Sequence, residues 1–186
     1  MKKAIKVLLE GGVAAIPTDT VYGLAAMPFD KKAVAKLYSV KGRSDRKPIA
    51  LLVSSKADAT RFAKSIPAKA KKLMDRYWPG PLTLVFRKKS SVPDFLTSGL
   101  STIGIRMPKD LTALKIIRAA GGALAVTSAN RSGGKPAVTA EEAGRLKNVD
   151  IVIKGKCAIG EPSSVVLVTG TGLKVLRKGP GLELDA

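Results

Sequence analysis

The chain contains no histidine and only one cysteine, Cys157, among its 186 residues. The absence of histidine excludes a Ser-His-Asp triad, a Cys-His pair and a histidine-ligated zinc site. A single cysteine can form neither an internal disulfide nor a cysteine cage for a metal. Any catalysis must therefore use lysine, arginine, carboxylates, hydroxyls, backbone groups or a loosely held metal ion.

Aromatic residues and long apolar runs are also scarce. Aromatics make up 4% of the sequence, so the core must be mostly aliphatic, and large stacking platforms for single-stranded nucleic acid are not expected. No apolar run approaches the ~20 residues of a membrane span. The N-terminal stretch MKKAIKVLLEGG is too short for a signal peptide and lacks a small-residue cleavage site. These absences predict a cytoplasmic protein without membrane contact.

Acidic residues are few relative to basic ones, 14 against 33, which gives a formal net charge of +19. Such an excess favours polyanionic partners, nucleic acid first and nucleotide phosphates next. A solvated basic surface, or a generally basic proteome, is the alternative. The basic residues are concentrated between Lys31 and Lys89, which favours a basic face over a basic tail.

The chain length and the hydrophobic and charged fractions, 45% and 25%, are typical of one folded domain. We expect a single domain over residues 1–186, with a core from about 3 to 180 and a short C-terminal tail, and a monomer is favoured. Helical patterns alternate with short apolar runs, which predicts an α/β fold. The expected helices cover 3–10, 31–40, 56–64, 68–77, 111–120 and 139–146, and the expected strands cover 13–16, 49–53, 82–86, 102–106, 124–127, 151–153, 165–168 and 174–177.

Continuous apolar strands between helices indicate a sheet with helices on both faces. The last third of the chain is rich in strands, which adds antiparallel pairs. The prediction is therefore a twisted, mixed parallel and antiparallel sheet in one domain.

Four polar segments directly follow apolar runs, and ligands of open α/β sheets bind beyond the carboxyl ends of strands. The first segment, PTDTVYGL at 17–24, gathers hydroxyls and is expected to be a ligand-facing loop. The second, KGRSDRKP at 41–48, gathers cations, of which Arg43 can fork onto a phosphate while Lys41 acts as a point charge. A solvated basic loop is an equally weighted reading of that composition.

The other two segments carry an arginine and a cluster of hydrogen-bond donors. Arg106 ends an apolar strand and therefore needs an anionic partner, either a carboxylate of the protein or a ligand. The segment TSANRSG at 127–133 follows a buried strand and offers hydroxyls and an amide, although a helix-capping turn would look the same.

Taken together, these segments resemble the YrdC family. The matching stretches are PTDTVYGLAA, KGRSDRKPIALLV, WPGPLTLVF, IGIRMP, TSANRSG, PSSVV and VLRKGPG, in the family's order from about Pro17 to Pro180. The resemblance implies a twisted α/β sheet around a deep, positively charged cavity. It also implies an L-threonylcarbamoyladenylate synthase, a nucleotidyltransferase that uses ATP, L-threonine and bicarbonate to begin a tRNA base modification.

The resemblance further implies roles for particular residues. The catalytic cations would be Lys41 and Arg43. The nucleotide and its phosphates would be held by the same two residues together with Ser128, Asn130 and Arg177. The threonine pocket would be shaped by Thr20, Arg106, Thr127 and Ser164, with Arg106 on the carboxylate. Mg²⁺ would arrive with ATP, and no dedicated protein metal site is expected. Double-stranded RNA, tRNA or tRNA-modifying proteins would be the macromolecular partners.

The sequence departs from the family pattern in places. Ser44 follows Arg43 where many members carry a proline, and Leu52 or Val53 stands where many carry a histidine near the strand end. The residue that contacts threonine on that side is therefore open. Two other functions remain: a non-catalytic RNA-binding module of the same fold, and the related chemistry of hydrogenase-maturation carbamoyltransferases. The second is disfavoured because those chains are far longer and carry zinc fingers.

Overall fold

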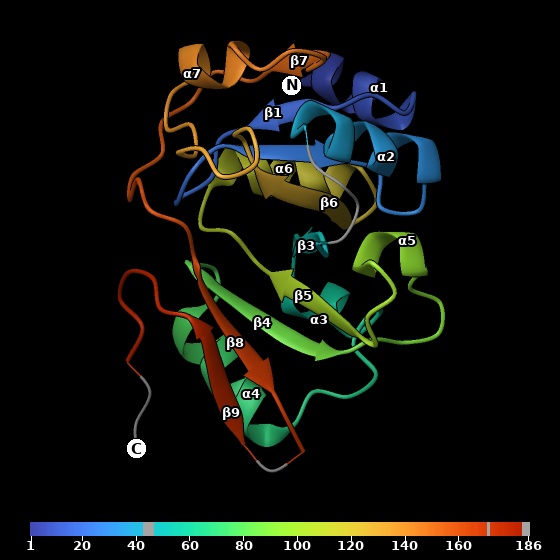
Figure 1. Cartoon of the computed structure of the whole chain (residues 1–186). Coiled ribbons are helices and arrows are strands. Elements are labelled where there is room, and N and C mark those ends of the chain that lie inside the picture. Colours follow the sequence, from blue (N-terminus) through green and yellow to red (C-terminus); the bar gives the residue numbers. More distant parts are fainter. Residues whose placement is uncertain (43–46, 171, 184–186) are drawn as a thin grey trace.

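The computed structural model describes residues 1–42, 47–170 and 172–183, and its centre is a nine-stranded sheet (Figure 1). The strand order is β7-β1-β2-β6-β3-β5-β4-β8-β9. The strands are β1 Ala14–Ile16, β2 Gly23–Ala26, β3 Ala50–Val53, β4 Leu82–Arg87, β5 Thr102–Arg106, β6 Ala123–Ser128, β7 Ile151–Val152, β8 Ser164–Val168 and β9 Leu173–Arg177. The helices are α1 Lys2–Leu9, α2 Lys31–Val40, α3 Lys56–Ala59, α4 Ala68–Tyr77, α5 Asp94–Thr97, α6 Leu111–Ala119 and α7 Ala140–Gly144.

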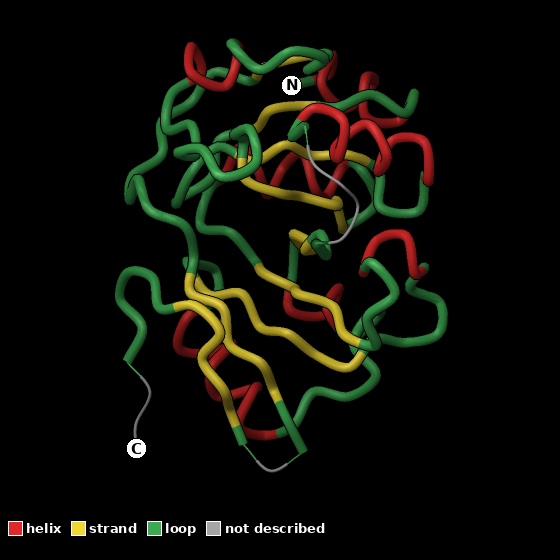
Figure 2. Tube along the Cα trace, viewed as in Figure 1, coloured by secondary structure: helices red, strands yellow, loops and turns green. Residues whose placement is uncertain are grey.

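The sheet is mixed, as the sequence predicts. The neighbours β1 and β7, β3 and β5, and β4 and β8 run parallel, whereas the other adjacent pairs run antiparallel. Figure 2 shows the strands in yellow crossing the molecule from its upper to its lower part, with helices in red at the periphery. In the part of the chain that the structure describes, no helix is long and apolar enough to cross a bilayer.

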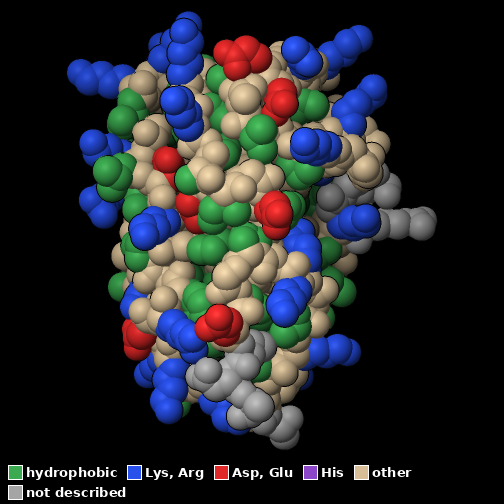
Figure 3. All heavy atoms as spheres, turned by 90° about the vertical axis from the view of Figure 1, so that its left-hand side faces the viewer, with side chains coloured by type: hydrophobic (Ala, Val, Ile, Leu, Met, Phe, Trp, Pro, Cys, Tyr) green, Lys and Arg blue, Asp and Glu red, His purple; other side chains and the backbone are tan. Residues whose placement is uncertain are grey.

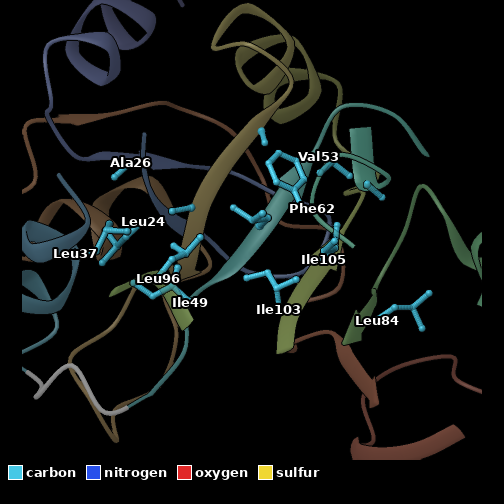
Figure 4. Packing of buried hydrophobic residues seen from close by; sticks show 14 of the residues in the cluster. Leu24, Ala26, Leu37, Ile49, Val53, Phe62, Leu84, Leu96, Ile103 and Ile105 are labelled. Carbon is cyan, nitrogen blue, oxygen red and sulfur yellow. The ribbon is translucent and has the colours of Figure 1, made fainter. Parts of the chain in front are cut away.

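Helices cover both faces of the sheet. Successive side chains of β3 belong to buried clusters on opposite faces, which explains why its apolar run is continuous. Leu51 and Val53 belong to one buried cluster and Leu52 to another, so this strand is buried on both sides. The first cluster includes Leu37 of α2 and Leu73 of α4, and Figure 4 shows Leu37 beside Leu24 and Leu96 of the same cluster. The second lies beneath α1 and α6 and includes Leu8 and Ile116.

Most predicted elements are confirmed, and three differ. The predicted loop 17–24 gives way to β2 at Gly23, where an added Cβ would lie 2.6 Å from Val126 Cγ1, so close strand packing needs glycine there. The predicted helix 56–64 ends at Ala59, after which Ala63 forms an isolated bridge with Lys88. The short helix α5 was not predicted from the sequence.

Strand β9 lies at one end of the sheet order and pairs with β8. Its consecutive residues Val175 and Leu176 point to opposite faces of the sheet, and they are 42% and 53% exposed. Both faces of this strand therefore meet solvent.

Candidate functional site

Lys41 is the centre of the first part of the site. It follows the last residue of α2 and is only 3% exposed, so its ammonium group requires partners within the protein. Its Nζ donates to the backbone oxygen of Ser128 at 2.7 Å and to Asn130 Oδ1 at 2.8 Å. Ser128 Oγ in turn donates to Asn130 Oδ1 at 2.7 Å. The structure thus brings together three of the residues predicted to hold a nucleotide.

The loop after β6 keeps these groups in place. Ala129 N donates to the Tyr22 oxygen at 2.8 Å, and Ser132 N donates to the Lys41 oxygen at 2.9 Å. A hollow of about 250 Å³ borders Asn130 on this loop. Its lining includes three cations, Arg131, Lys135 and Arg145, and one carboxylate, Glu142. The Asn130 side of the site therefore has positive charge close by, as an anionic ligand requires.

Arg106 is the centre of the second part. Its side chain is 7% exposed and its guanidinium donates in three directions: Nε to the Gly80 oxygen at 2.9 Å, Nη1 to Thr20 Oγ1 at 2.8 Å and Nη2 to Asp19 Oδ1 at 2.6 Å. Burial lowers the pKa of Arg106 from its ordinary value, while the charge and hydrogen bond of Asp19 oppose that change and Arg177 adds to it. The sequence left open whether the anionic partner of Arg106 is a carboxylate of the protein or a ligand, and the structure shows a carboxylate of the protein, Asp19.

The two parts of the site lie at different levels along the strands of the sheet. Arg106 is level with Leu52, which is level with Leu124, whereas Ser128 lies four residues further along β6, about 13 Å at ~3.3 Å per residue. The segment between β1 and β2 connects them. Its Thr20 receives the hydrogen bond from Arg106, and the Tyr22 oxygen receives the one from Ala129.

Ser164 and Arg177 adjoin Arg106 through the turn at 78–81. Ser164 N donates to the Pro81 oxygen at 2.9 Å, one residue from the Gly80 oxygen that Arg106 holds. Arg177 Nε donates to the Ser163 oxygen at 2.9 Å, and burial lowers the pKa of Arg177. Since Arg106 and Arg177 are close enough to affect each other electrostatically, an anion between them would be stabilised by both.

The remaining predicted residues are placed less fully. Thr127 is level with Leu24 in the β2–β6 ladder, and no side-chain hydrogen bond joins it to the other site residues among those described. Arg43 lies outside the described residues. Cys157 is half-buried, and burial raises the pKa of its thiol, which disfavours the nucleophilic thiolate. Residues 1–42, 47–170 and 172–183 contain no group of three His, Cys, Asp or Glu side chains arranged to hold a metal ion.

Asp19 holds Arg106 in the structure, and the sequence interpretation left it unassigned. The signal was present, because Asp19 lies in the segment expected to face a ligand and Arg106 was expected to need an anion. What was missing was the link between two positions 87 residues apart in the chain.

The sequence matches the model of the Sua5, YciO and YrdC proteins, described as "Telomere recombination", over residues 6–179. The chain belongs to this family. The family membership agrees with the resemblance on which the site was predicted, and the arrangement of Lys41, Ser128 and Asn130 gives that resemblance a structural basis.

Family members with assigned names are similar over nearly the whole chain. The threonylcarbamoyl-AMP synthase of Pyrococcus abyssi is 40% identical over 182 residues, which are 95% of this chain and 52% of that protein. The putative threonylcarbamoyl-AMP synthase of Methanocaldococcus jannaschii is 35% identical over 179 residues, 94% of this chain and 83% of that protein. The chain thus spans about half the length of the first relative and most of the second.

Solved structures of the family share the fold. P. abyssi Sua5 complexed with L-threonine superimposes with a TM-score of 0.91 at 36% identity, covering 95% of this chain and 53% of that one. E. coli YciO superimposes with a TM-score of 0.86 at 28% identity, covering 96% and 88%. HypF, at 21% identity and a TM-score of 0.81, shares the fold alone and extends far beyond it, since the match covers 28% of that chain.

Proposed function

We propose that this chain is an L-threonylcarbamoyladenylate synthase. The net reaction joins L-threonine, bicarbonate and ATP to give threonylcarbamoyl-AMP, pyrophosphate and water. The observation that carries the proposal is the buried Lys41 ammonium, held by Ser128 and Asn130 in a chain whose family includes named synthases. A site of this kind suits phosphate chemistry and needs no histidine.

The chemistry proceeds by addition and displacement. The unprotonated amine of threonine adds to the carbon of CO2 formed from bicarbonate, and the nitrogen loses a proton to give a carbamate. A carbamate oxygen then attacks the α-phosphorus of ATP, the bond to the bridging oxygen breaks and pyrophosphate leaves with that electron pair. Neither step requires a side-chain nucleophile, which agrees with the protonated state that burial favours for Cys157.

The protein's part in this reaction is control of charge. An anionic carbamate attacks an anionic triphosphate, so fixed cations must stabilise the charge that develops on the phosphates. Lys41 and Arg43 would do this, with Arg177 on the nucleotide, while Arg106, Thr20, Thr127 and Ser164 would bind threonine. Mg²⁺ would enter as part of the ATP complex, because it binds mainly phosphate oxygens and water and the described residues offer no cage of carboxylates.

All of these residues come from one chain, so the proposal needs no partner subunit. ATP, threonine and tRNA are cytoplasmic, which is the compartment we assign to the enzyme on the basis of these proposed substrates.

The test is an omission experiment on the purified protein. Pyrophosphate release is measured with ATP, Mg²⁺, bicarbonate and L-threonine, and then with each component left out in turn. We expect release only in the complete mixture. Release that continues without threonine or without bicarbonate, or no release from folded protein, would contradict the proposal.

RNA binding is a second candidate function, favoured by the net charge of +19. Figure 3 shows one face of the molecule, on which lysine and arginine side chains are spread over the surface rather than gathered in one patch. A surface of this kind would track the phosphate backbone without reading bases. We expect double-stranded RNA to bind and its association constant to fall at least about tenfold between ~50 and ~200 mM salt. Filter binding across that range measures it, and undetectable binding at low salt would exclude this function.

A further inference from the structure

The hydrogen bonds around Thr20 fix what this residue can offer a ligand. The Thr18 hydroxyl donates to the Val21 oxygen at 2.7 Å, so Thr18 Oγ1 acts as acceptor for the Thr20 hydroxyl at 2.9 Å. The Thr20 hydroxyl therefore donates its hydrogen to Thr18 Oγ1, and one of its lone pairs accepts the hydrogen bond from Arg106 Nη1. One lone pair remains, so Thr20 can accept a hydrogen bond from a ligand but cannot donate one.

Arg106 offers the opposite polarity. A guanidinium carries five N–H groups, and the described contacts use three of them. One N–H is left on each terminal nitrogen, which is the number that a carboxylate accepts in a bidentate pair. A carboxylate on Arg106 and a donor group on Thr20 would lie side by side, because Arg106 Nη1 and Thr20 Oγ1 are 2.8 Å apart.

Asp19 sets the charge of this region. Its side chain is 6% exposed, and its Oδ1 accepts from Arg106 Nη2 at 2.6 Å and from Lys109 N at 3.0 Å. Its Oδ2 is buried and has no hydrogen-bond partner among the described residues. An asparagine could make both Oδ1 contacts, so what the carboxylate adds is its negative charge. That charge offsets the charge of Arg106, which would otherwise add to the charge of the nearby Arg177.

We infer that Asp19 is a positioning residue that makes this part of the site select a zwitterion, with the ligand carboxylate on Arg106 and its ammonium on Thr20. The negative charge of Asp19 repels a simple carboxylate, whereas it attracts the ammonium group that an amino acid carries beside its carboxylate. The inference rests on the proposed function for the identity of the amino acid, L-threonine, and extends it by naming the residue that excludes acids lacking the amine.

The test measures binding rather than turnover. Calorimetry gives the dissociation constants of L-threonine and of (R)-3-hydroxybutyrate, which is L-threonine without its amine, for the wild type and for Asp19→Asn. In the variant we expect threonine to bind on the order of tenfold more weakly and the des-amino acid on the order of tenfold more tightly. A variant with a damaged fold would bind both ligands more weakly. Changes in opposite directions therefore separate an effect of charge from an effect of misfolding.

Asp30→Asn is the matched control. Asp30 caps α2 by accepting from Lys32 N at 2.8 Å and from Ala33 N at 3.0 Å, and asparagine caps equally well. It removes the same charge without touching Arg106, and the two dissociation constants should keep their ratio. An unchanged ratio in Asp19→Asn, or an equal change in the control, would overturn the inference.

The wild type tests the inference by itself if Asp19→Asn does not fold. The des-amino acid should bind at least about tenfold more weakly than threonine, and equal affinities would overturn the inference. If the wild type binds threonine in this way but releases no pyrophosphate, the proposed reaction fails while the selection rule stands. If pyrophosphate release depends on threonine but the ratio does not move in Asp19→Asn, the selection rule fails alone.

Discussion

Replacing Lys41 by alanine is expected to lower the rate of threonine-dependent pyrophosphate release by about 10²–10³. Lys41 is buried, and its ammonium group donates to the Ser128 oxygen at 2.7 Å and to Asn130 Oδ1 at 2.8 Å. Initial rates at saturating substrate give the effect, and the dissociation constant for ATP shows how much of it is lost ground-state binding.

Lys36→Ala is the control for this experiment. Lys36 lies on the same helix, is exposed and donates to the Gly11 oxygen at 3.1 Å, far from the residues proposed to bind ATP. It removes one positive charge from α2 just as Lys41→Ala does. If both variants lost activity to the same extent, a general loss of positive potential would explain the result and the specific role of Lys41 would be wrong.

Replacing Arg106 by methionine is expected to destabilise the protein by about 3–5 kcal/mol and to abolish threonine-dependent turnover. The loss of stability arises because Asp19 would remain buried without its counter-charge, and because the Gly80 oxygen would lose its hydrogen bond from Nε. Urea unfolding followed by circular dichroism measures the change in the free energy of unfolding.

The double variant Asp19→Asn/Arg106→Met separates the charge from the shape. It leaves no buried charge in this place, so most of the stability should return while turnover stays absent. Arg118→Met, on the exposed side of α6, should leave both quantities nearly unchanged. A double variant as unstable as the sum of its two single variants would show that Asp19 and Arg106 are not coupled.

The sequence named candidate residues for the site, but it held less information about the contacts between them. The strand that ends at Ser128 and the helix that ends before Lys41 both follow from local patterns, and the family resemblance placed them together. The pairing of Arg106 with Asp19 could not be read in this way, because it depends on how the sheet brings the segment after β1 against the end of β5. Local sequence patterns hold no information on how these two distant segments pack against each other.

The helix that ends early has a similar explanation. The apolar spacing of 56–64 fits a longer helix, but Phe62 and Ala63 are buried, and Ala63 forms an isolated bridge with Lys88, just beyond the end of β4. Tertiary packing overrides helical propensity there. Arg43 lies outside the described residues, so its predicted contact with phosphate stays a prediction.

Some of the excess positive charge lies on strand β9, where it has a consequence that involves no ligand. A strand at the edge of a sheet with apolar side chains on both faces, Val175 and Leu176, invites the same strand of another molecule to pair with it. Lys174 and Lys178 are exposed on this stretch and would meet the same cations on any second copy. Repulsion between like charges disfavours the pairing of two such edges, so we expect these lysines to reduce aggregation through β9.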